Sequence, residues 1–241
     1  MLRFHVLLVL IVSLLPSANC SAQADSDVAA MQLSKALRQD GTQLDLRGSG
    51  NSEIDFNALH NPLFNNVHSL LLARSTISDS ALSNIKHLSI HELDLYYTNI
   101  SDKGLLHLKN LPLKRLTLTG TKISDAGLRY LSKLPLEVLL LRNTNISGLG
   151  LKYLPTQTLQ HLDLSYTRIN DAELKKIPSL PALKQLDISD TQISQFGLEA
   201  LLTSSTPNTV MIANTAISDE AVKILAERYK NITFITKAAI R

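Results

Sequence analysis

Seven copies of one hydrophobic frame follow one another along most of the chain. In each copy a central isoleucine is preceded, seven and five positions earlier, by Leu, Ile or Val, and the same residue types follow it at five and eight positions. The central residues lie 23 or 24 positions apart and are Ile77, Ile100, Ile123, Ile146, Ile169, Ile193 and Ile217. A fixed period of this length predicts a stack of units, each of which buries its apolar side chains against its neighbours.

Each copy predicts a short strand, a turn and a short helix. The two leading apolar positions are two apart and point to one side of a strand, whereas the trailing two, three apart, mark one face of a helix. A Ser or Asn follows each central isoleucine as a suitable helix N-cap, and in five copies an Asp beside it adds negative charge that favours the first helical turn. A hydroxyl two positions before the isoleucine predicts a turn whose buried backbone groups need a local partner. These hydroxyls belong to Ser75, Thr98, Thr121, Thr144, Thr167, Thr191 and Thr215.

The clearest copies, Leu93–Pro112 and Leu116–Pro135, have the form L-x-L-x-x-T-x-I-S-D-x-G-L-x-x-L-x-x-L-P. This form resembles the leucine-rich repeat family over residues 42–225. It is most similar to the bacterial repeats akin to the cysteine-containing subclass, with Thr in place of Cys. The resemblance implies an α/β fold, a right-handed solenoid with parallel strands on its concave face and short helices on its convex face. It implies nothing about the identity of a partner.

The regions at both ends fit a single solenoid domain. Residues 25–41 are expected to form an N-terminal capping helix that begins at Ser26 or Asp27 and stops at Gly41. An irregular first rung then carries 26 residues from Leu44 to Leu70. Residues 226–241 are expected to form a C-terminal cap, with a closing strand at residues 231–236.

Residues 1–24 resemble a secretory signal peptide. Arg3 is followed by a ten-residue apolar run, Val6–Leu15, which is too short to span a membrane as a helix. Cleavage after Ala24 would start the mature chain at Asp25. Two alternatives stay open, a lipid on Cys20 as in bacterial lipoproteins and a retained N-terminal anchor. The sequence thus predicts a secreted or periplasmic protein, which is attached to a membrane if Cys20 carries the lipid.

Composition excludes several classes of function. The chain has 24 Lys and Arg against 21 Asp and Glu, so nothing electrostatic favours nucleic acid. A single cysteine provides neither a disulfide framework nor a zinc site built on Cys. No phosphate-binding loop, nucleophile elbow or zinc-protease motif occurs, and we expect neither an enzyme nor a cofactor.

Two sequence patterns are interpreted as by-products of the repeat. His68 and His91 occupy the same position in adjacent copies, but even with Glu92 they are too few for a metal, so we expect a solvated pair. N-glycosylation sequons occur at Asn99 and Asn145, where the T-N-I-S sequence of the repeat produces them, and a third lies at Asn231.

The residues flanking the strand leucines vary between copies and should line the concave face. Only 5% of the chain is aromatic, yet three of its six tyrosines lie in this small set. Tyr and Arg are enriched at interface hot spots, and a surface of mixed charge suits a protein partner. We therefore expect a monomeric binding module, the alternative being a structural or envelope role without a discrete ligand. The candidate partner-binding residues are Asp94, Tyr96, Tyr97, Arg115, Arg142, His161, Asp163, Tyr166 and Asp187.

Overall fold

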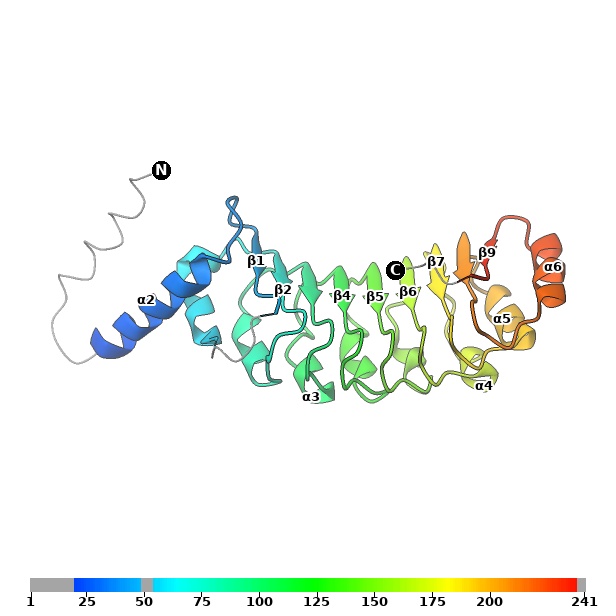
Figure 1. Ribbon diagram of the computed structural model, residues 1–241, viewed down its shortest axis with the longest axis horizontal. Helices are drawn as coiled ribbons and strands as arrows, with labels where there is room; N and C mark the ends of the chain where they lie inside the picture. Colours follow the sequence, from blue (N-terminus) through cyan, green and yellow to red (C-terminus); the bar gives the residue numbers. More distant parts are fainter. Residues whose placement is uncertain (1–19, 49–53, 238–241) are drawn as a thin grey trace.

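Nine parallel strands form one sheet whose order follows the chain from β1 to β9 (Figure 1). The computed structural model describes residues 20–48 and 54–237. The middle residues of adjacent strands pair in register, as Leu93 does with Leu116 and Leu116 with Leu139. The strands are β1 (Gln43–Asp45), β2 (Ser69–Leu71), β3 (Glu92–Asp94), β4 (Arg115–Thr117), β5 (Val138–Leu140), β6 (His161–Asp163), β7 (Gln185–Asp187), β8 (Thr209–Met211) and β9 (Thr233–Ile235).

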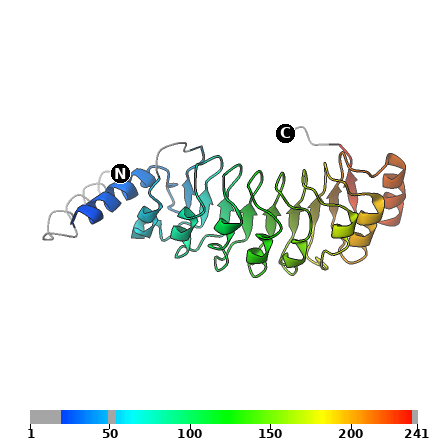
Figure 2. The ribbon, with the colours of Figure 1, turned by 90° about the horizontal axis from the view of Figure 1, so that it is seen from below.

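The opposite side of the stack carries short helices, as Figure 1 and the view from below in Figure 2 show. Most of those between Phe56 and Tyr153 are 3-10 turns, and within the repeats α-helices of eight residues or more occur toward the C-terminus. The helices are α2 (Cys20–Ser34), η1 (Phe56–His60), η2 (Pro62–Phe64), η3 (Ala81–Ile85), α3 (Asp102–Leu105), η4 (Leu128–Leu131), η5 (Leu151–Tyr153), α4 (Asp171–Leu174), α5 (Gln195–Leu202) and α6 (Asp219–Arg228). The chain therefore forms the predicted α/β repeat solenoid, with the strands on one face and the helices on the other.

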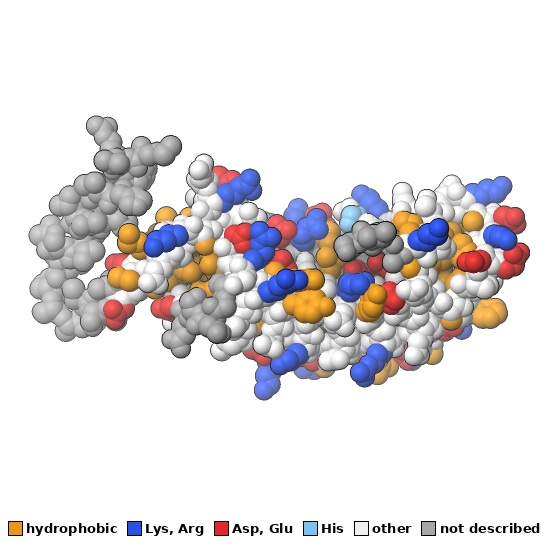
Figure 3. Space-filling model, viewed as in Figure 1, with side chains coloured by type: hydrophobic (Ala, Val, Ile, Leu, Met, Phe, Trp, Pro, Cys, Tyr) orange, Lys and Arg blue, Asp and Glu red, His pale blue; other side chains and the backbone are white. Residues whose placement is uncertain are grey.

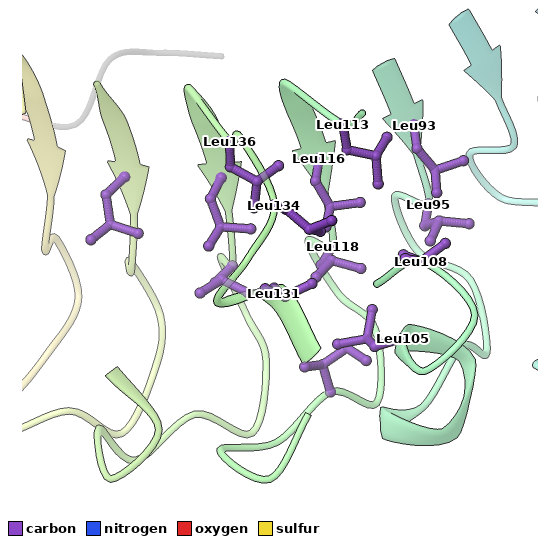
Figure 4. Packing of buried hydrophobic residues seen from close by; sticks show 14 of the residues in the cluster. Leu93, Leu95, Leu105, Leu108, Leu113, Leu116, Leu118, Leu131, Leu134 and Leu136 are labelled. Carbon is purple, nitrogen blue, oxygen red and sulfur yellow. The ribbon is translucent and has the colours of Figure 1, made fainter. Parts of the chain in front are cut away.

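Leucine ladders fill the space between these two faces (Figure 4). Leu93, Leu95, Leu105 and Leu108 of one rung are fully buried, and their counterparts in the next rungs stack beside them. Burying one such side chain contributes about 1.5–3 kcal/mol. Because every rung presents the same leucines, its core is completed by its two neighbours rather than by itself.

The threonine hydroxyls act within their own rung. In each of six rungs the Thr Oγ1 donates to the carbonyl oxygen three residues earlier, as Thr144 does to Leu141 at 2.6 Å. This confirms the prediction of a buried turn stabilised by a local hydroxyl. Ser75 occupies the same position in the rung before that of Thr98, but its buried Oγ has no hydrogen-bond partner within the described part of the chain.

The N-cap prediction is confirmed at four of the seven rungs. Ser101, Asn170, Ser194 and Ser218 cap α3, α4, α5 and α6 through side-chain acceptors. It is wrong for Ser78, Ser124 and Ser147, because the helical turns of those rungs start three or four residues later as 3-10 turns.

Aspartates join four of the rungs to the next rung, an arrangement that sequence reasoning missed. Asp102 accepts hydrogen bonds from the backbone N–H of Ser124 at 2.8 Å and from its Oγ at 2.5 Å. The sequence suggested only that these aspartates stabilise the first turn of their own helix. Their main contacts instead fix the spacing between rungs. The same joint occurs between Asp79 and Ser101, Asp125 and Ser147, and Asp171 and Ser194.

The N-terminal helix differs in extent from the expected one. α2 covers Cys20–Ser34, so it includes the predicted cleavage point after Ala24 and ends before Gly41. It ends because the chain reverses direction, and Leu37 pairs with Leu44 as an antiparallel bridge. Residues 1–19, with most of the predicted signal peptide, lie outside the described residues.

Both ends of the core are covered. Ala30 and Leu33 of α2 are buried against the first rung, and α2 extends outward from that end of the sheet (Figure 2). At the other end α6 buries Leu225, and β9 pairs with β8 as the expected closing strand. Within the described ranges no helix combines the length and apolar character needed to cross a membrane.

Candidate functional site

The outward strand positions form the concave face, where the candidate residues lie. In β3, β6 and most other strands the middle leucine is buried while its two neighbours are partly exposed. Asp94, Asp163 and Asp187 end their strands, whereas Arg115 and His161 begin theirs. The parallel register therefore places the candidate residues in rows that run across the sheet.

A left-handed turn follows each strand from β1 to β8 and displays the next candidates. Tyr97 and Tyr166 have φ values of 50° and 56°, a conformation that bulky residues rarely adopt. Both side chains are about half exposed. Residues in this turn with positive φ are Gly48, Arg74, Tyr97, Gly120, Asn143, Tyr166, Asp190 and Asn214.

Arginines and tyrosines pack against each other along this edge. The Arg142 guanidinium lies 4.0 Å from the centre of the Tyr166 ring, and its Nη1 donates to Ser165 Oγ at 3.0 Å. Arg74 lies 5.6 Å from the centre of the Tyr96 ring. We call Arg74, Tyr96, Tyr97, Arg142 and Tyr166 the arginine–tyrosine platform. Cation–π contacts of this kind hold long arginine side chains in defined positions.

The Tyr97 ring links three rungs of the platform. It packs edge to face on Tyr96, with the ring centres 4.6 Å apart. It also lies so close to Gly120 that a Cβ there would come within 3.0 Å of the ring. At the far side Asn143 Nδ2 donates to the Tyr97 hydroxyl at 3.4 Å. Gly120 is therefore required for this ring to lie flat across the next rung.

The concave aspartates are held by backbone N–H groups. Asp94, Asp163 and Asp187 accept from the residues two positions later, Tyr96, Ser165 and Ser189, at 2.9 Å each. Burial raises the pKa of Asp94 and of Asp163 above the ordinary value, despite these hydrogen bonds. For Asp163 the neighbouring Asp187 adds to the rise.

The remaining candidates lie apart from the platform. Arg115 forms an ion pair with Glu92, whose oxygen is 3.5 Å from Nε. His161 is partly exposed in β6, between Val138 and Gln185. No described contact joins these residues to the tyrosines.

Sequence reasoning did not select Arg74, Asn143 or Ser165, although each contacts a selected residue. Arg74 occupies the same turn position as Tyr97, and that equivalence is the signal that could have identified it. A broad shallow depression at this end of the sheet adds two more residues, Arg47 and Asp45, which pair at 2.6 Å. Its lining consists of Asp45, Arg47, Gly48, Ala73, Arg74, Asp94 and Tyr96.

The histidine pair fits no metal centre. The rings of His68 and His91 lie 5.1 Å apart in an edge-to-face arrangement, and His68 Nδ1 lies 3.1 Å from the carbonyl oxygen of Ser89. Among residues 20–48 and 54–237, no three His, Cys, Asp or Glu side chains are placed to hold a metal ion.

Family models match two parts of the repeat region. A model described as leucine rich repeats (2 copies) matches residues 157–200, and a single leucine rich repeat model matches residues 109–132. With the solenoid of nine in-register strands, these matches identify the repeats of this chain as leucine-rich repeats. Its assignment to the cysteine-containing subclass stays a prediction. No curated protein matches the sequence.

Solved structures show the same fold. Internalin C2 from Listeria monocytogenes is 27% identical over 81% of this chain and 80% of its own, with a TM-score of 0.57. An internalin of the same organism, InlF, is 21% identical over 87% of this chain and 67% of its own, with a TM-score of 0.55. The yeast Rad7 and Elc1 complex contains a chain that is 15% identical over 73% of this chain and 53% of its own, with a TM-score of 0.53.

Proposed function

We propose that this protein is an exported, non-enzymatic binding module that recognises a protein partner through its concave face. The observation that carries the proposal is the arginine–tyrosine platform. Two of its tyrosines, Tyr97 and Tyr166, are exposed, contact neighbouring side chains and lie in left-handed turns that cost conformational energy. Such strain is typical of functional sites, and Tyr and Arg dominate interface hot spots.

The charge pattern supports a protein partner over a polyanion. Asp94, Asp163 and Asp187 share the concave face with Arg74 and Arg142, so the described part of this face does not carry the row of like positive charges that a nucleic-acid backbone favours. Figure 3 likewise shows Lys and Arg side chains interspersed with Asp and Glu on the face it displays. Mixed charges of this kind favour one orientation of a protein partner.

Export is supported by the N-terminal sequence. The apolar run Val6–Leu15 and the A-x-A site ending at Ala24 have the form of a signal peptide. We propose that the mature monomer acts outside the cytoplasm, secreted or periplasmic, and that a lipid on Cys20 would tether it to a membrane. Mass spectrometry of the N-terminus distinguishes Asp25 from a modified Cys20.

The binding proposal is tested with two matched double variants. Tyr96→Ala with Arg142→Ala removes concave side chains, whereas Tyr153→Ala with Arg129→Ala removes the same residue types from the helix face. Proteins cross-linked to each variant in the native compartment are quantified against the wild type. We expect a partner that is lost from the concave variant and kept by the convex one. Equal capture by both variants would overturn the proposal and favour a structural role.

A further inference from the structure

Two arginines of the platform form no ion pair of their own, unlike the other arginines of the concave face, although Arg142 is near enough to Asp163 to favour ionisation of that carboxyl. Arg47 pairs with Asp45 at 2.6 Å, and Arg115 pairs with Glu92 at 3.5 Å. Neither Arg74 nor Arg142 forms an ion pair with any carboxylate in the described ranges. Their guanidinium groups are nevertheless positioned, because each is held over a tyrosine ring. Stacking uses the face of a guanidinium and leaves N–H groups on its edge for a planar anion.

The distance between the two arginines indicates how far apart two anionic groups of a ligand must be. Arg74 and Arg142 belong to rungs that are three steps apart in the repeat. At about 4.8 Å per strand, this places them roughly 14 Å apart across the sheet. An extended peptide rises about 3.3 Å per residue, so two carboxylates about four residues apart would span that distance.

The surface between the arginines suits the middle of such a segment. Tyr96 and Tyr97 present an edge-to-face pair there, and Gly120 lets the Tyr97 ring lie flat. The Asn143 amide holds the Tyr97 hydroxyl at 3.4 Å. These rings are already ordered before binding, so little side-chain entropy is lost when a peptide packs on them.

The acidic residues of the concave face limit where an acidic segment can lie. Over β6, β7 and the turns after them, the outward positions carry Asp163, Asp187 and Asp190 and neither Lys nor Arg. Asp94 lies close to the path, but it accepts from the Tyr96 backbone N–H and interacts favourably with Arg47. Negative charge is therefore favoured over β2 to β5 and disfavoured over β6 and β7.

We propose that the arginine–tyrosine platform binds an extended acidic peptide segment of a protein partner, with two carboxylates about four residues apart paired to Arg74 and Arg142. The proposal rests on the function proposed above, since it names the chemistry that the concave face recognises. The central residues of the segment pack on Tyr96 and Tyr97. Binding weakens with added salt, because both anchoring pairs are partly exposed.

Fluorescence anisotropy with synthetic peptides tests the proposal directly. The probes are fluorescein-labelled dodecapeptides with two glutamates four residues apart, the same peptide with glutamines, and a third with adjacent glutamates. Each labelled peptide is held at a fixed concentration while the protein is added up to about 1 mM, which covers the weak affinity of a short fragment. We expect the first peptide to bind at least about tenfold more tightly than the other two.

Single variants show where the peptide binds on the protein. Arg74→Gln and Arg142→Gln should each lower the affinity for the peptide with spaced glutamates about tenfold. Arg142→Lys should also lower this affinity, because lysine cannot form a bidentate pair. Arg129→Gln on the helix face is the matched control and should leave binding unchanged. Circular dichroism establishes that each variant keeps its fold.

The outcomes separate this inference from the general function. Equal affinity for the glutamate and glutamine peptides, or no binding by any of them, would overturn the acidic-segment proposal. The binding module itself would survive that result if the Tyr96→Ala, Arg142→Ala variant still loses a partner that the convex variant keeps. If the concave variants keep both the cross-linked partner and the peptide, the acidic-segment proposal and the binding-module proposal are both overturned.

Discussion

Gly148 and Glu173 lie in adjacent rungs so close together that a Cβ on Gly148 would overlap the Cβ of Glu173. In other rungs the relationship is reversed, since a glycine makes room for the aspartate of the preceding rung. These pairs are Asp79 with Gly104, Asp102 with Gly127, and Asp171 with Gly197. Where Gly148 replaces the aspartate, Glu173 replaces the glycine. The two positions therefore form one joint between rungs.

The joint between Asp102 and Gly127 should show strong energetic coupling. Gly127→Ala would place a methyl group against the Asp102 carboxylate and destabilise the protein by about 1–3 kcal/mol. Asp102→Ala removes the hydrogen bonds to Ser124 and should cost about 1.5–3 kcal/mol. In the double variant the overlap with the carboxylate is gone and only Leu105 Cδ1, 3.0 Å from the new Cβ, stays close, so the loss should be smaller than the sum. Urea unfolding of all four proteins measures the coupling, and strictly additive losses would contradict the joint.

Alanine substitutions at two glycines with positive φ distinguish the cost of backbone strain from the cost of steric overlap. Gly41 has a φ of 72° and open space where a methyl group would lie, whereas Gly148 has a φ of 114° and faces Glu173. Gly41→Ala should cost about 1–2 kcal/mol from strain alone. Gly148→Ala should cost more, and Glu173→Gly in the same chain should recover part of the difference. Thermal or urea unfolding provides the comparison, and equal losses at the two glycines would contradict it.

The buried hydroxyl groups at equivalent positions of two rungs, Thr144 and Ser75, should respond differently in stability when they are removed. Thr144 donates to the Leu141 carbonyl, so Thr144→Val should lower the free energy of unfolding by about 1–2 kcal/mol. Ser75 is buried without a hydrogen-bond partner among the described residues, so Ser75→Ala should be neutral or stabilising. Urea denaturation of the two variants distinguishes them. A large loss from Ser75→Ala would show that its hydroxyl has a partner in solution.

The pH dependence of stability should reflect the raised pKa of Asp163. Burial raises this pKa, with Asp187 adding to the effect, so between the unfolded and the native pKa the native state holds a proton that the unfolded chain has released. The contribution of Asp163 to stability is therefore greatest below the unfolded pKa of about 3.9 and falls as pH rises through the native pKa. Asp163→Asn keeps an acceptor for Ser165 but cannot ionise. Its stability relative to wild type should increase as pH rises above about 4.

Asp125 provides the control of opposite sign. Burial opposes its ionisation, but hydrogen bonds from Ser147, Gly150 and Gly148 outweigh burial and lower its pKa. Its contribution to stability is present above about pH 3.9 and is lost as pH falls through the native pKa. Asp125→Asn should therefore lose stability relative to wild type as pH rises. Parallel urea titrations from acidic to neutral pH test both signs, and matching slopes would contradict the assignment.

The repeat and its buried residues could be predicted because each follows from local periodicity. Leu93 and Leu95 are two apart, so their burial on one side of a strand requires no knowledge of other rungs. The Asp102–Ser124 joint could not be predicted in this way, since the bond crosses from one rung to the next. Its signal was present in the paired exchange of Gly148 and Glu173, which becomes meaningful once the rungs are stacked.

The candidate site was predictable in position but not in its contacts. Tyr97 and Tyr166 were selected because they occupy variable positions beside buried leucines. Their left-handed conformations, and the stacking of Arg142 on Tyr166, depend on the geometry of the turn after each strand. Arg74 was left out because nothing in the linear pattern shows that its guanidinium lies over Tyr96.

Site-specific photo-cross-linking tests recognition by the concave face most directly. A photoreactive phenylalanine analogue replaces Tyr166 on the platform in one sample and Tyr153 on the helix face in another. Both tyrosines are partly exposed, so the two probes meet solvent to a similar extent. We predict one discrete adduct that forms from position 166 in the native compartment and is absent from position 153. The same adduct from both positions, or from position 153 alone, would contradict recognition through the concave face.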